Sequence, residues 1–81
     1  MNKATYKVTT TYGTERTLEF REHYHENNYG NGKFITVLRV DDDEMIAYVD
    51  MRYRNYVFET FCENYIKDYY GTNLFTYKRI S

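Results

Sequence analysis

The sequence contains no proline and no tryptophan, and it has a single cysteine and a single serine. Without proline, its turns must come from four glycines and from asparagine and aspartate residues. The lone cysteine, Cys62, cannot form an internal disulfide, which favours a reducing compartment. The only serine is the terminal Ser81, a poor place to hold a nucleophile in fixed geometry, so serine-based catalysis is all but excluded.

The chain also lacks an excess of charge and a long apolar run. Its formal net charge is -1 and its pI is about 6.1, which argues against a dedicated binder of duplex DNA or of anionic membranes. No stretch approaches the ~18 apolar residues of a membrane span, and the segment MNKATYKV has no apolar signal sequence. We therefore expect a cytoplasmic protein with no membrane partner.

Tyrosine is the residue that the chain has in abundance, with 11 copies in 81 residues. A chain of this length forms one domain, residues 1–81, whose core is close to the lower size limit for independent folding. Tyrosine must therefore serve in the core as well as on the surface. Half-exposed tyrosine rings suit contacts with other molecules.

Apolar periodicity predicts an α+β fold in the order ββββαβ. Four segments alternate with the period of a strand, one amphipathic segment follows between the possible cap Asn55 and Gly71, and a short last strand closes the chain. The favoured turn pair Asn31-Gly32 is expected to end the loop between the second and third strands. We predict a four- to five-stranded antiparallel sheet with one helix packed on one face, built from strands 4–12, 16–25, 34–40, 45–53 and 74–80 and helix 56–70.

The hairpin formed by residues 34–40 and 45–53 is predicted to place Val40 opposite Met45 across the acidic turn DDDE. That register fixes both faces of the sheet, because side chains alternate along a strand. The helix-covered face should then carry Val8, Leu18, Phe20, Phe34, Leu38, Val40, Ala47, Val49 and Met51. The outer face should carry Ile35, Val37, Arg39, Ile46, Tyr48 and Asp50.

The motifs that suggest chemistry are each incomplete. His23 and His25 share a strand face as two metal ligands can, but zinc takes three or four ligands and no third one lies near. The run of acids at 41–44 lacks the spacing of a calcium loop, and Gly30 to Lys33 lacks that of a phosphate loop. Cys62 fits the apolar side of the helix. We predict no catalytic residue, no metal and no cofactor, and hence a non-enzymatic protein.

The predicted outer face is the best candidate for function, because one helix cannot cover both faces of a sheet. An exposed apolar cluster with a charged rim favours binding of another protein or of a second copy of the chain. The chain would then act as an adaptor, an inhibitor or a homodimer. The predicted partner-binding residues are Ile35, Val37, Ile46, Tyr48, Arg39, Asp50, Arg21, His23 and His25.

Two alternatives stay open. Arg52, Tyr53, Arg54 and Tyr56 interleave cations with rings, the combination that binds single-stranded nucleic acid. The abundance of tyrosine, asparagine and threonine without proline or glutamine is also associated with small phage or mobile-element proteins of low-GC bacteria. Inhibition of a host defence nuclease, as anti-CRISPR proteins achieve it, would be one form of protein binding.

Overall fold

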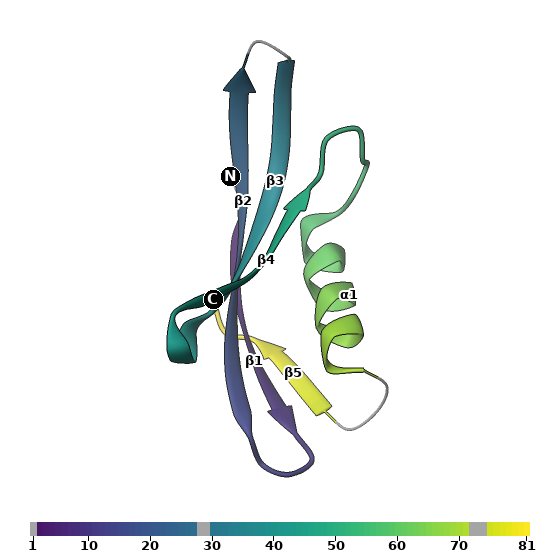
Figure 1. Ribbon diagram of the computed structural model, residues 1–81. Helices are drawn as coiled ribbons and strands as arrows, with labels where there is room; N and C mark the ends of the chain where they lie inside the picture. The colour runs from purple at the N-terminus through teal and green to yellow at the C-terminus, as the bar shows by residue number, and fades with distance from the viewer. Residues whose placement is uncertain (1, 28–29, 72–74) are drawn as a thin grey trace.

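The computed structural model describes residues 2–27, 30–71 and 75–81, and their side chains except those of residues 25–27, 30 and 31. Its elements follow the order ββββαβ and confirm the α+β fold (Figure 1). They are β1 (Lys3–Thr10), β2 (Glu15–Asn27), β3 (Gly30–Arg39), the 3-10 turn η1 (Val40–Asp42), β4 (Glu44–Asp50), α1 (Phe58–Tyr70) and β5 (Phe75–Arg79).

The five strands of the described residues form one antiparallel sheet in the order β4-β3-β2-β1-β5. The hairpin of β2 and β3 is the longest part of the sheet and projects past the end of α1 (Figure 1). Asn31 and Gly32 lie within β3, so the prediction that they end a loop is wrong. The predicted last strand is confirmed as β5 beside β1, although its predicted first residue, Leu74, lies outside the described residues.

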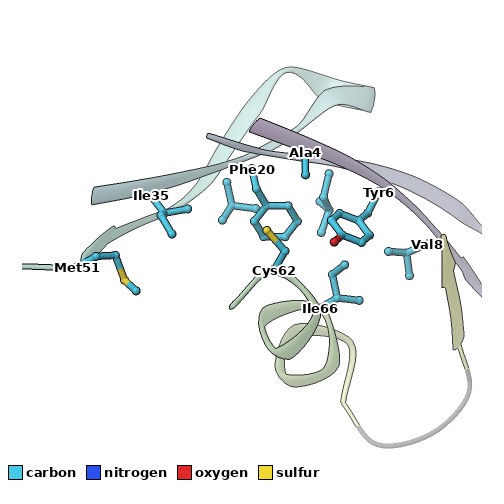
Figure 2. Close-up of a cluster of buried hydrophobic side chains, with 10 residues drawn as sticks. Ala4, Tyr6, Val8, Phe20, Ile35, Met51, Cys62 and Ile66 are labelled. Atoms are coloured by element: carbon cyan, nitrogen blue, oxygen red, sulfur yellow. The ribbon is translucent and has the colours of Figure 1, made fainter. Parts of the chain in front are cut away.

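The core lies between α1 and one face of the sheet, which we call the inner face. Figure 2 shows Tyr6, Phe20 and Ile35 directed from the strands towards Cys62 and Ile66 on the helix. Phe20 and Tyr65 meet edge to face, with ring centroids 5.7 Å apart. Burial of this apolar area is the main stabilising term for so short a chain. The predicted core residues Val8, Leu18, Phe20 and Met51 are buried, and Ala47 and Val49 pack against the core from β4.

The pairing of β3 with β4 differs from the predicted register, by one residue between Phe34 and Val37 and by two residues at Leu38 and Arg39. Val37 lies opposite Ala47 and Ile35 opposite Val49, because a bulge at Ile46 interrupts the ladder and η1 takes Val40 out of the strand. A one-residue shift moves every side chain of a strand to the other face. Ile35 and Val37 therefore belong to the core, whereas Phe34, Leu38 and Val40 do not.

Helix α1 begins at Phe58, two residues after the predicted start, and Val57 takes the cap position predicted for Asn55. Its end is as predicted, because Gly71 adopts a positive φ of 74° that favours glycine over other residues. Cys62 and Ile66 are buried at i and i+4 on one side of the helix. The Tyr77 hydroxyl donates to Glu63 Oε1 at 2.9 Å and ties α1 to β5.

Candidate functional site

A patch of apolar side chains lies on the outer face of the sheet, the face directed away from α1. We call Phe34, Leu38, Met45 and Tyr48, together with the polar Thr36 among them, the outer patch. Leu38 pairs with Met45 and Thr36 pairs with Tyr48 across β3 and β4, so the patch is continuous over two strands. More than half of the surface of Met45 (58%) and of Tyr48 (59%) is exposed. Large apolar side chains are thus left in solvent on this face, at its β4 edge.

His23 extends the outer patch onto β2 as part of a stack of rings. Its imidazole stacks on Phe34 with centroids 4.7 Å apart and 8° between the planes. Phe34 in turn stacks on Tyr48 at 4.7 Å. His23 Nε2 is hydrogen-bonded to Thr36 Oγ1 at 2.8 Å, which fixes the orientation of the ring. The stack offers a flat, pre-ordered surface on three neighbouring strands.

Charged side chains flank the outer patch in ion pairs. Glu19 Oε1 accepts from Arg21 Nε at 2.6 Å, and Lys3 Nζ lies 3.9 Å from the same carboxylate. At the other side of the outer patch, Arg52 Nη2 lies 2.8 Å from Asp50 Oδ2. A charged rim around an apolar centre is the usual anatomy of a protein interface.

The outer patch overlaps the predicted partner-binding residues only in part. Four of the predicted residues lie on the outer face, as predicted, namely Tyr48, Asp50, Arg21 and His23. The side chain of His25 is outside the described residues. The placement of the other four predicted residues on this face is wrong, namely Ile35, Val37, Ile46 and Arg39.

The physical reason is the shifted register. Ile35 and Val37 are fully buried under α1, and the bulge at Ile46 lets that side chain pack half-buried against the core. Arg39 pairs with the core residue Leu18 across β2 and β3, so it shares the inner face. One signal in the sequence indicates this arrangement: Thr36 is the only polar residue of FITVL, which favours Ile35 and Val37 as the inward pair.

The acidic turn at 41–44 is occupied by contacts within the chain. Asp42 and Glu44 both accept hydrogen bonds from Arg39, at 2.5 Å and 2.8 Å. The hydrogen bond from Arg39 holds the pKa of the Asp42 carboxyl below its usual value. Asp41 Oδ2 accepts from the backbone N–H of Thr17 at 2.7 Å. Three of the four acids therefore brace the β3–β4 connection.

The predicted nucleic-acid segment lies at the corner between β4 and α1. Tyr53 has a positive φ of 63° and is 97% exposed, while the Arg52 guanidinium lies 6.0 Å from the centre of its ring. Tyr56 is half-buried, and its hydroxyl donates to Glu22 Oε2. Burial, with the hydrogen bond to Glu22 as a second cause, raises the pKa of Tyr56. The structure thus exposes Arg52, Tyr53 and Arg54 and anchors Tyr56.

Two clefts that sequence reasoning missed open on either side of this corner. The larger, about 790 Å³, is lined by rings of the corner and of α1, and we call it the aromatic cleft. The smaller, about 310 Å³, is lined by cations of β3 and of the corner, and we call it the basic cleft. Both share Arg54, Asn55 and Tyr56. No sequence motif marks them, because they arise from packing of the 51–57 segment against the β2–β3 hairpin and α1.

The groups most often used in catalysis do not gather in the described part of the chain. Cys62 is fully buried, and desolvation raises the pKa of its thiol to about 12, so it is a neutral thiol at physiological pH. Within the described residues, no three side chains of the His, Cys, Asp and Glu types are grouped to hold a metal ion.

No described helix is long and apolar enough to cross a membrane. No protein-family model matches the chain, and no curated protein and no solved structure is significantly similar to it.

Proposed function

We propose that the protein is a non-enzymatic protein-binding module whose partner packs on the outer patch. The observation that supports this most is the exposure of Tyr48 and Met45, on the edge strand β4, on a sheet face that α1 does not cover (Figure 1). Aromatic and methionine side chains are enriched in the centres of protein interfaces, where their burial supplies most of the binding energy.

The geometry also favours a rigid interface. The rings of His23, Phe34 and Tyr48 are held in their stack by contacts within the unbound chain. A pre-ordered surface loses less conformational entropy on binding than one made of free side chains. The charged pairs around it, such as Arg21 with Glu19, would select among partners rather than supply affinity.

The partner is another protein or a second copy of the chain, and inhibition of a nuclease would be one consequence of such binding. The test begins with affinity capture from the cells that make the protein, followed by reconstitution with each purified protein recovered. Sedimentation velocity of the chain alone tests self-association. Titration calorimetry then compares wild type with Tyr48→Asp and with the control Tyr12→Asp, which alters an exposed tyrosine in the β1–β2 turn.

We expect Tyr48→Asp to weaken the reconstituted complex by about tenfold or more and Tyr12→Asp to leave it unchanged. Equal affinities of wild type, Tyr48→Asp and Met45→Asp for the partner would overturn the proposal. So would a wild-type chain that remains a monomer at all concentrations and yields no reconstituted complex.

A second candidate function is binding of single-stranded nucleic acid at the β4–α1 corner. The observation that favours it is the exposure of Arg52, Tyr53 and Arg54 beside the two clefts. Rings that stack on bases and cations that neutralise phosphates are the two elements of such sites. Retention of oligonucleotides that falls steeply with salt would support this function, and retention that salt does not change would exclude it.

A further inference from the structure

The basic cleft has the charge of a phosphate site. Lys33, Arg52 and Arg54 line it, and no carboxylate is among its lining residues. Arg52 is held in place by Asp50, whereas Lys33 and Arg54 form no ion pair with another residue in the described ranges. The Arg54 guanidinium donates to the sulfur of Met51, at 3.7 Å. Two cations are therefore available to an anion that enters the cleft.

The aromatic cleft has the chemistry of a site for a flat ring with polar edges. Tyr56, Phe61 and Tyr65 form a continuous row along it, with centroid separations of 6.3 Å and 6.4 Å. Thr60, Asn64 and Asp68 recur at i, i+4 and i+8 of α1 and supply hydroxyl, amide and carboxylate groups along the same wall. A nucleobase requires this combination, because it stacks through its face and is read through hydrogen bonds at its edge.

The two clefts adjoin, as the base and the phosphate of one nucleotide do. Their shared wall is made of Arg54, Asn55 and Tyr56. Tyr56 cannot swing freely, because its hydroxyl donates to the buried carboxylate of Glu22. Glu22 also accepts from the Asn2 side chain at 3.2 Å. The wall between the clefts is thus tied to β2 and to the segment that precedes β1.

We propose that the two clefts form one nucleotide-binding site, with the base in the aromatic cleft and the phosphate in the basic cleft. This inference is independent of the outer patch and deepens the second candidate function. The exposed ring of Tyr53 next to the basic cleft offers a stacking surface for a further base, so the ligand is a nucleotide within a single strand. A local site of this kind fits a chain whose net charge is only -1.

The test is fluorescence anisotropy with labelled single-stranded DNA and RNA of about eight nucleotides, with a mononucleotide as competitor. Arg54→Ala removes a cation of the basic cleft, and Arg16→Ala is its matched control, an exposed arginine near the β1–β2 turn. Phe61→Leu removes a ring of the aromatic cleft, and Phe58→Leu is its control in the same helix, outside the cleft. Thermal unfolding of each variant confirms that it is folded.

We expect Arg54→Ala to weaken binding about tenfold and to reduce the salt slope by about 0.7, while Arg16→Ala has little effect. Phe61→Leu should weaken binding more than Phe58→Leu, by about fivefold or more. If Arg54→Ala weakens oligonucleotide binding but Phe61→Leu and Phe58→Leu bind equally well, the two-cleft site is refuted. Binding of nucleic acid at the corner would still be supported. No binding by wild type at low salt would overturn both. If a mononucleotide binds as tightly as the oligonucleotide, the ligand of the clefts is a free nucleotide, and the proposal that it is part of a single strand is refuted.

Discussion

Val37 and Val40 give a direct test of the β3–β4 register, because the observed register buries Val37 and exposes Val40, whereas the predicted register did the reverse. The same substitution, valine to alanine, can be made at both positions. Val37 is fully buried opposite Ala47, whereas Val40 lies in η1 and is 44% exposed. The predicted register placed them the other way round, so the two variants separate the two arrangements.

The cost of Val37→Ala follows from its burial. The change removes two buried carbon groups, each worth about 0.8 kcal/mol in transfer from water. A cavity between Phe20 and Ala47 adds to this, because both neighbours of Val37 are held by strand pairing. The total is about 2 to 3 kcal/mol. Val40→Ala should cost about 0.5 kcal/mol or less, because its side chain is already exposed and lies outside the core.

Urea denaturation followed by circular dichroism measures both values. We expect a lower midpoint for Val37→Ala with an unchanged m-value, and a midpoint near that of wild type for Val40→Ala. In thermal unfolding, a loss of this size lowers Tm by about 10 °C or more for a domain of this length. A larger loss of stability for Val40→Ala than for Val37→Ala would refute the register and, with it, the outer patch.

Further predictions concern buried hydroxyl and thiol groups. Tyr6→Phe should leave stability unchanged or raise it by about 1 kcal/mol in urea denaturation, because the buried Tyr6 hydroxyl has no hydrogen-bond partner among the described residues. Tyr56→Phe should lower it by about 1 to 3 kcal/mol, because it removes the hydrogen bond to Oε2 of the buried Glu22 carboxylate and leaves Asn2 as the other side-chain donor described there; a gain would contradict the anchoring role of Tyr56. Burial raises the pKa of Cys62 from 9.0 to about 12, so its contribution to stability is complete below pH 9 and is lost as pH rises towards 12. Cys62→Ala should therefore flatten the fall in unfolding free energy between those values, and an unchanged slope would show that the thiol ionises equally in the folded and unfolded states.

The sequence was sufficient to predict the elements and their order, because these depend on local periodicity and on stop signals such as Gly71. Alternation in β1 and β2 also identified Val8, Leu18 and Phe20 as core residues. The β3–β4 register was not predictable in the same way. FITVLRV is apolar on both faces, and the loop that sets the pairing depends on contacts of Arg39 with two acids and on the left-handed backbone at Asp43.

In the candidate sites too, features that depend on local alternation were predictable, and features that depend on strand register or loop packing were not. The alternation of side chains along β2 and β4 correctly predicted that His23 and Tyr48 lie on the outer face, because several apolar residues in each strand indicate which side chains face the core. The contact of Phe34 with both rings depends on the register and was missed. The clefts were missed because they depend on where the 51–57 segment packs, which no residue pattern determines.

NMR can locate the partner-binding surface of the chain residue by residue. The amide and side-chain signals of the isotope-labelled chain would be followed during titration with the reconstituted partner, or during a dilution series if the partner is a second copy. If the partner packs on the outer patch, the largest shifts and intensity losses will fall on Phe34, Thr36, Met45 and Tyr48. Changes confined to α1 and the β4–α1 corner, with the outer patch unaffected, would refute binding at the outer patch.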